Sequence, residues 1–221
     1  MKHFLRDNGL SLVMFGLFVF FLIAQSITGL GVYNDDQHEH GGATISYPEY
    51  LHTGHFVEAT FENWESEYLQ MGAYVLFTVF LFQRGSSESK DPDKEEAVDE
   101  DPRQAQDRPD VPRPVRGGGL ALKLYEYSLS IAFLLLFLFS FGLHAIGGAR
   151  EYSQEQLAHG GRAVSTMEFL RTSEFWFQSF QNWQSEFLAV FSIVVLSIFL
   201  RQRGSPESKP VAAPHSKTGN A

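Results

Sequence analysis

Apolar residues along the chain are gathered in four blocks that polar segments separate. The first block runs from about 9 to 32 without a charged side chain, and the third, from about 122 to 147, contains a long unbroken apolar run. At a rise of about 1.5 Å per residue, each block is long enough for a hydrocarbon core of about 30 Å. The pattern therefore predicts a membrane-spanning helix in each of these two blocks.

The second and fourth blocks have shorter apolar runs, which aromatic residues extend to about 61–83 and 180–202. Trp64 and Trp183 would then lie at the level of the lipid headgroups, where amphipathic aromatic rings are favoured. We therefore predict four transmembrane helices. The alternative is a set of helices buried in a soluble core, which would have to cover four such segments with protein.

The two halves of the chain resemble each other. A shift of 119 positions aligns residues 5–90 with 124–209 without a gap, and about 34 of the 86 aligned pairs are identical. This identity indicates a duplicated helical hairpin. Each unit has an even number of spans, so both units have the same orientation and the repeat is parallel. The expected fold is an all-α membrane protein with four transmembrane helices in two parallel tandem-repeat hairpins.

This repeat predicts the domain organisation. The first two-span unit is expected over 1–85 and the second over 120–204. Residues 86–119 between them are rich in proline and acidic residues, a composition typical of a disordered linker. The tail over 205–221 is expected to be disordered as well.

Both outer loops contain sequence signals for helix N-termini, in which a polar cap residue is followed three residues later by Gln or Glu. In each loop, the pair nearer the preceding span predicts a short helix that ends at His-Gly-Gly. These pairs are Asn34 with Gln37 and Ser153 with Gln156. The second pairs predict short helices along the membrane interface, and they are Ser46 with Glu49 and Ser165 with Glu168.

Charge predicts the orientation. No Lys or Arg occurs between Arg6 and Arg84, whereas the amino-terminal stub, the linker and the tail hold most of them. The positive-inside rule then places both termini and the linker in the cytoplasm.

A net charge of -9 argues against a nucleic-acid partner, and the absence of Cys excludes a disulfide scaffold and a Cys-ligated zinc site. A cleavable signal peptide is the alternative for the first block, and a retained span is favoured because the third block has the same layout.

The element Asn-Trp-x-Ser-Glu is the candidate functional site. Asn63 and Glu67 are four residues apart and share a helix face, as do Asn182 and Glu186. A carboxylate about one turn inside the bilayer needs a partner. The preceding spans bring Gln25 and His144 to a similar depth, which predicts contacts of Gln25 with Glu67 and of His144 with Glu186. The expected interface anchors are Trp64, Trp183, Arg84 and Arg203.

Two interpretations of this element stay open. In the structural one, its Asn and Glu side chains satisfy backbone donors where the outer loop enters the membrane. In the functional one, Glu67 and Glu186 form a cation or proton site. A metal enzyme is a third interpretation, but the outward histidines do not form the His-Glu-x-x-His pattern of a zinc protease. We expect no catalytic residue, no cofactor and no metal site.

The element Arg-Gly-Ser-x-Glu-Ser-Lys follows the second and the fourth predicted spans. It is typical of a helix stop with a cytoplasmic anchor. A lipid headgroup site or a partner site is the alternative interpretation.

The run Asn182-Trp183-Gln184-Ser185-Glu186-Phe187 resembles an uncharacterised family of small bacterial membrane proteins that an Asn-Trp-Gln-Ser-Glu-Phe motif marks. The first copy departs from this motif at Glu65 and Tyr68. The resemblance covers both units; it implies the bacterial plasma membrane and offers no activity. We expect a non-enzymatic structural or interaction component of the cell envelope, whose partners are the lipid bilayer and a second copy or another membrane protein. The alternative is a small transporter or channel-like protein.

Overall fold

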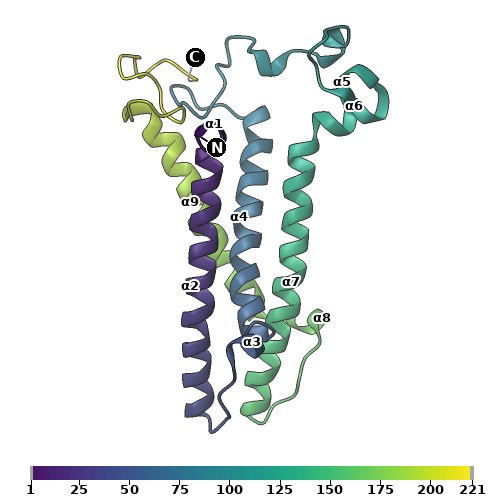
Figure 1. The fold of residues 1–221 in the computed structure, drawn as a ribbon, viewed down its shortest axis with the longest axis vertical. Coiled ribbons are helices and arrows are strands. Elements are labelled where there is room, and N and C mark those ends of the chain that lie inside the picture. Colours follow the sequence, from purple (N-terminus) through teal and green to yellow (C-terminus); the bar gives the residue numbers. More distant parts are fainter. Residues whose placement is uncertain (1, 220–221) are drawn as a thin grey trace. The chain divides into compact units, whose positions relative to one another are not determined.

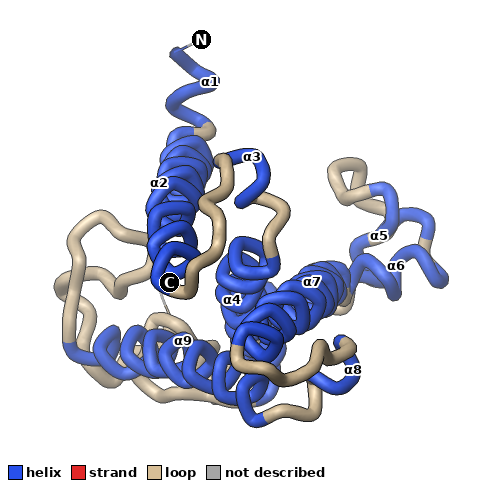
Figure 2. Tube along the Cα trace, turned by 90° about the horizontal axis from the view of Figure 1, so that it is seen from below, coloured by secondary structure: helices blue, strands red, loops and turns tan. Residues whose placement is uncertain are grey.

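Apolar helices dominate the chain. The computed structural model describes residues 2–219, without the side chain of Lys2, and within that range it is helical and holds no strand (Figures 1 and 2). Three helices are long and apolar enough to cross a membrane: α2 (Gly9–Glu39), α7 (Ser128–Ala158) and α9 (Ser173–Phe199). They correspond to the first, third and fourth predicted spans.

The second predicted span lies within α4 (Gly54–Phe80), which has 27 residues. Its length would suffice for a bilayer, but its first half carries four glutamates, at positions 58, 62, 65 and 67. This acidic half explains why α4 is not among the three apolar helices.

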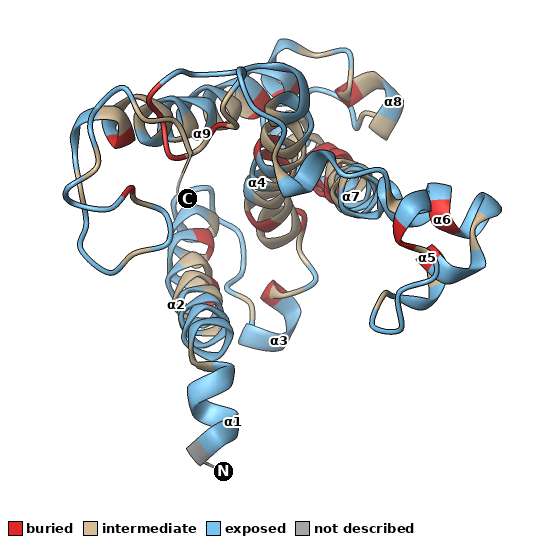
Figure 3. Cartoon of the chain, turned by 90° about the horizontal axis from the view of Figure 1, so that it is seen from above, coloured by how far each residue is buried: buried red, intermediate tan, exposed pale blue. Residues whose placement is uncertain are grey.

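The apolar helices are scarcely covered by protein. In the most apolar window of α2 and of α9 only 6% of residues are buried, and in that of α7 only 17%. Figure 3 shows this exposure along α2, which is pale over most of its length. Soluble monomers rarely expose contiguous apolar surface on this scale, so the finding argues against the soluble-core alternative and for a membrane protein.

The remaining helices are short. In chain order they are α1 (Lys2–Asp7), α3 (Tyr47–Tyr50), η1 (Ala97–Asp99), η2 (Pro102–Ala105), α5 (Arg113–Gly117), α6 (Gly119–Glu126) and α8 (Thr166–Phe169). The helices α6 and α7 are separate, because the backbone breaks from helical geometry at Tyr127. The third predicted span therefore begins within α6 and continues in α7.

Two predicted short helices are wrong. Asn34 and Ser153 lie inside α2 and α7, which each have 31 residues and continue past the predicted span ends. Their side chains hold the returning loop instead of capping a new helix. Asn34 Oδ1 accepts from the Ile45 N–H at 2.8 Å, and Ser153 Oγ accepts from the Val164 N–H at 3.0 Å. The predicted stops at His-Gly-Gly are confirmed, because Gly41 and Gly160 follow the two helix ends with φ of 74° and 77°.

The other two N-terminal signals are confirmed. Ser46 and Glu49 form a capping box at the start of α3, and Ser165 and Glu168 form one at the start of α8. In each box the glutamate accepts from the backbone N–H of the serine at 2.8 Å. Four consecutive residues of local sequence are enough to specify this geometry.

The chain forms two compact units. Unit 1 consists of Met1–Phe61 with Gly142–Trp176, and unit 2 of Glu62–Phe141 with Phe177–Ala221. Each unit therefore takes residues from both halves of the chain, and α4, α7 and α9 each run from one unit into the other.

Unit 1 is organised by two aromatic side chains that lie on glycines. Tyr50 of α3 lies against Gly29 of α2, and Phe169 of α8 lies against Gly148 of α7; a methyl group at either glycine would overlap the ring. Tyr50 is 1% exposed and Phe169 is fully buried. The two contacts are 119 positions apart, which is the offset that aligns the two halves of the sequence.

Unit 2 includes the connecting segments. Residues 86–118 contain η1, η2 and α5, and ion pairs join Lys90 to Asp99 at 2.5 Å and Arg108 to Glu100 at 2.6 Å. In the tail, Lys209 is 1% exposed, and its ammonium donates to the carbonyls of His215 and Lys217 at 3.0 and 2.9 Å. The disorder predicted for both segments stays a prediction.

Candidate functional site

A buried carboxylate lies in unit 2, between α4 and α9. Glu65 of α4 is fully buried, and its Oε1 accepts a hydrogen bond from the Ser179 hydroxyl at 2.9 Å. The same oxygen accepts from the indole N–H of Trp183 at 3.2 Å. A charge that is removed from water needs such donors, because an unpaired buried carboxylate is strongly unfavourable.

A second polar contact joins the same two helices. Gln70 is 8% exposed, and its Nε2 donates to the backbone carbonyl of Glu186 at 3.0 Å. Gln70 follows Glu65 by about one and a half helical turns, so polar side chains of α4 meet α9 at two levels. Side-chain hydrogen bonds of this kind hold helices together in an apolar environment.

The part of α7 that belongs to unit 2 contacts Trp183, a donor to Glu65. The Phe137 ring meets the Trp183 ring edge to face, with 6.4 Å between the centroids. Ser140, three residues after Phe137, is fully buried, and its hydroxyl has no hydrogen-bond partner within the described part of the chain. Trp183 therefore both donates to Glu65 and packs against an aromatic ring of α7.

The four predicted residues of the Asn-Trp-x-Ser-Glu element also lie in unit 2. Asn63 and Glu67 are exposed, and Asn182 and Glu186 are half-buried. The structure brings Glu67 and Glu186 close enough for their charges to interact. The Asn182 side chain donates to the Gln178 carbonyl of its own helix at 3.1 Å.

The two predicted partners lie in unit 1. Gln25 is half-buried, and His144 is fully buried with its ring stacked on Phe175 at a centroid distance of 4.7 Å. The predicted contacts of Gln25 with Glu67 and of His144 with Glu186 would join residues of different units, and they stay predictions.

Of the predicted interface anchors, Trp183 directs its indole N–H to the fully buried Glu65. Trp64 is half-buried. Arg84 pairs with Asp93 at 2.8 Å, whereas Arg203 has no such ion pair within residues 2–219.

Sequence reasoning missed Glu65. At 100° per residue, Glu65 and Glu67 point in nearly opposite directions on α4, and the sequence does not indicate which one faces the interior. One signal was present. Glu65 aligns with Gln184, so it is a charged residue that only one copy carries within an otherwise shared element.

Two histidines of unit 1, His40 and His159, lie close together just after the ends of α2 and α7. The rings of His40 and His159 are 6.2 Å apart, and each Nδ1 hydrogen-bonds a carbonyl of the preceding turn. Across the described residues, no three His, Asp or Glu side chains are placed to hold a metal ion. The two histidines act as helix C-terminal caps in this structure.

The family-model comparison covers almost the whole chain. Residues 1–220 match the model of a domain of unknown function, DUF6766. The chain therefore belongs to this family. No curated protein and no solved structure matches the chain.

Proposed function

We propose that this family member is a four-span integral membrane protein that acts as a non-enzymatic structural or interaction component of the bacterial cell envelope. The observation that carries the proposal is the use of its interior polar groups. Glu65 accepts bonds from Ser179 and Trp183, and Gln70 bonds the backbone of α9, so these groups join helices. Such bonds stabilise a helical scaffold in lipid and leave little of the interior polar surface for a substrate.

In this proposal α4 is the fourth span. Its apolar second half follows Glu67, and its buried acidic side chain is satisfied by α9, so the polar residues need not face lipid. The distribution of Lys and Arg supports cytoplasmic termini and a cytoplasmic linker in the plasma membrane. The contacts of Tyr50 with Gly29 and of Phe169 with Gly148 support the duplicated hairpin.

A second candidate function is transport of a cation or proton through a site at Glu67 and Glu186. It is favoured by one observation, the closeness of these two carboxylates. Two neighbouring carboxylates repel each other, and a shared cation or proton would relieve the repulsion.

Reconstitution into lipid vesicles separates the two functions. The structural proposal expects no cation or proton flux above that of protein-free vesicles, and a melting temperature that does not depend on the added cation. The comparison variant is Glu67→Gln with Glu186→Gln, and Glu39→Gln is the matched control at an exposed position at the end of α2. Flux that the double variant loses and the control keeps would overturn the structural role.

Fusion reporters test the topology. A cytoplasmic reporter placed in the linker near residue 107 should be active, and one placed near Gly42 should be inactive. A reversed pattern would contradict the orientation.

Co-purification tests the interaction role. Two differently tagged copies expressed together at native level should purify together in lipid nanodiscs, whereas an unrelated four-span protein should not purify with the tagged chain.

A further inference from the structure

The Arg-Gly-Ser-x-Glu-Ser-Lys element forms the same turn twice in unit 2, over residues 84–90 after α4 and 203–209 after α9. In both copies the glycine has a positive φ, 87° in the first and 86° in the second. In both, a serine hydroxyl accepts from the backbone N–H six residues earlier at 2.9 Å; the bonds join Gln83 to Ser89 and Gln202 to Ser208. The surroundings of the two turns can therefore be compared residue by residue.

The cations of the first turn are neutralised by the chain itself. The Arg84 guanidinium pairs with Asp93 at 2.8 Å. The Lys90 ammonium pairs with Asp99 at 2.5 Å. Both carboxylates come from the acidic segment that follows this turn, so the first copy already holds its anions.

The remaining donors of the first turn are also used. The Gly85 N–H donates to the Thr218 hydroxyl at 2.9 Å. The Ser86 side chain is fully buried and hydrogen-bonds the Ser197 hydroxyl at 2.9 Å.

The second turn keeps the same donors without acceptors. Within residues 2–219, the Arg203 guanidinium has no ion pair or hydrogen bond, and the Gly204 N–H has no acceptor. The Ser205 hydroxyl accepts from the Glu207 N–H at 3.1 Å and donates to no atom in that range. The segment after Lys209 contains no Asp or Glu that could take the place of the acidic linker. Three neighbouring donors are thus available in this copy.

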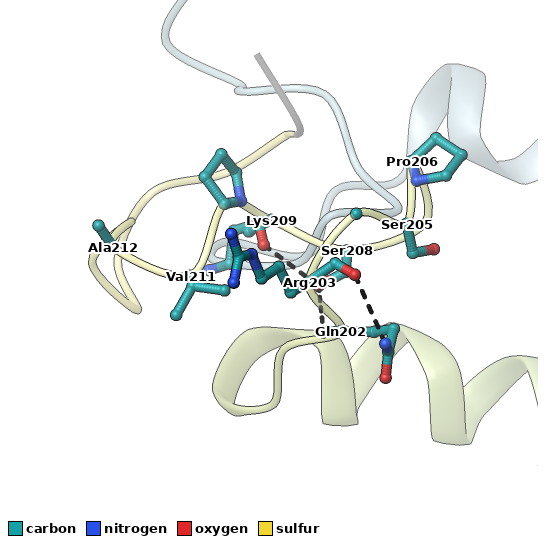
Figure 4. Close-up of a pocket in the computed structure, with 10 residues that line it drawn as sticks. Gln202, Arg203, Ser205, Pro206, Ser208, Lys209, Val211 and Ala212 are labelled. Carbon is teal, nitrogen blue, oxygen red and sulfur yellow. Dashed lines mark hydrogen bonds between the residues drawn. The ribbon is translucent and has the colours of Figure 1, made fainter.

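These donors border a cleft. It has a volume of about 840 Å³. Ten residues between Gln202 and Ala212 line it, and Glu207 is not among them (Figure 4). Pro206, Pro210 and Val211 supply an apolar wall beside Arg203 and Ser205. Lys209 contributes charge but few donors, because its ammonium is directed to the carbonyls of His215 and Lys217.

We propose that Arg203, the Gly204 N–H and Ser205 form a binding site for the phosphate group of an anionic phospholipid. A guanidinium binds phosphate through two parallel N–H donors, and a backbone N–H beside a left-handed glycine adds a third. Arg203 follows the last residue of α9 by four positions, so the end of this apolar helix brings the turn to the headgroup layer. The assignment rests on the proposed function only in placing that helix across a membrane.

The test measures lipid retention by the delipidated full-length protein in native mass spectrometry, with phosphatidylglycerol and phosphatidylcholine as probes. Wild type should prefer phosphatidylglycerol, and Arg203→Gln should lower this preference about tenfold. Arg84→Gln removes the same charge from the matching position of the first turn and should leave the preference within about twofold. Equal losses in the two variants would overturn the site, because they would reflect general surface charge.

A second pair of variants imitates the first turn. Val211→Asp supplies a carboxylate in the cleft and should abolish the preference, as Asp93 neutralises Arg84 in the first copy. Val211→Asn introduces a side chain of nearly the same shape as aspartate but without the charge, and this variant should keep the preference for phosphatidylglycerol. A preference that survives Val211→Asp would overturn the proposal.

Competition identifies the source of the phosphate. Inorganic phosphate at the concentration of the lipid should not displace phosphatidylglycerol, since it cannot use the apolar wall. Displacement at equal concentration would overturn the lipid assignment in favour of a free phosphate. If these lipid-binding experiments overturn the phospholipid site, the proposed function is unaffected, because that function is tested by flux and self-association.

Discussion

The hydroxyl of Ser179 donates a 2.9 Å hydrogen bond to the carboxylate of Glu65, and both side chains are fully buried. The first prediction concerns this pair. Glu65→Ala removes the acceptor of the buried Ser179 hydroxyl and of the half-buried Trp183 indole N–H, and should lower the free energy of unfolding by about 1–3 kcal/mol.

Glu65→Gln is the matched variant, because an amide oxygen can still accept from both donors and glutamine is the residue found at the aligned position 184. Its free energy of unfolding should stay within about 1 kcal/mol of wild type. Thermal unfolding in lipid nanodiscs measures both variants. Equal destabilisation by Ala and by Gln would contradict the hydrogen-bonding role.

The second prediction concerns the contact of Phe169 with Gly148. A methyl group on Gly148 would overlap a rigid, fully buried ring, so Gly148→Ala should destabilise the protein by about 1–3 kcal/mol. The control is Gly142→Ala in the same helix, where no neighbouring atom lies within 4 Å of the added carbon. This control should be neutral or stabilising by up to about 1 kcal/mol, because alanine favours helix. If the two variants had the same melting temperature, the packing assigned to α8 would be wrong.

The third prediction concerns the contribution of His55, in unit 1, to stability in acid. Burial lowers the pKa of His55 from its ordinary value, and nearby Asp36 opposes this only in part. The neutral ring hydrogen-bonds the Tyr50 hydroxyl through Nδ1 at 2.9 Å. The unfolded chain binds a proton more readily than the folded one, so the contribution of His55 is fully present above about pH 6.5 and is lost as the pH falls below it.

His55→Gln should remove this part of the pH dependence. The measurement is the melting temperature of wild type and variant between pH 8 and pH 5, and the difference between them should shrink as the pH falls. A constant difference across this interval would show that the folded and unfolded pKa values of His55 are alike.

The fourth prediction concerns Glu168. Hydrogen bonds from the Ser165 backbone and from Arg162 lower the pKa of this carboxyl to about 2. A carboxyl with a lowered folded pKa stabilises the protein above its unfolded value of about 4.5 and loses that contribution as the pH falls toward 2. Glu168→Gln should therefore flatten the decline in melting temperature over this interval. Glu174→Gln should not, because Glu174 lies outside the capping box of Ser165 and Glu168. Equal profiles for the two variants would rule out the assigned role of Glu168.

The parts of the structure that were predictable from the sequence depend on short-range information. The apolar runs identified α2, α7 and α9, and the pairing of Ser165 with Glu168 identified the start of α8, because a capping box needs only four consecutive residues. The same reasoning failed at Asn34. Its side chain bonds a backbone segment 11 residues away, and no local pattern distinguishes that partner from a helix cap.

The site was harder to predict, because tertiary packing decides which glutamate side chain of α4 faces the interior. Glu65 and Glu67 have the same local propensity, and only the position of α9 makes Glu65 the interior residue. The internal symmetry of the sequence pairs Glu67 with Glu186, and a joint site of the two stays a prediction. The symmetry does not indicate the Trp183 contact, because that contact joins the tryptophan of the second copy to a glutamate that only the first copy carries.

The division into two units has a consequence for biosynthesis. Unit 1 includes residues as far as Trp176, and unit 2 includes residues from Phe177 onward. The first half of the chain alone therefore completes neither unit. A ribosome that has synthesised the first hairpin has therefore completed no unit, and Tyr50 is the only one of the two glycine-seated aromatics that can be in place. In the proposed topology, the nascent first hairpin stays in the membrane without a complete unit until the second emerges, and a truncated chain ending at residue 119 is expected to be a substrate for membrane proteases.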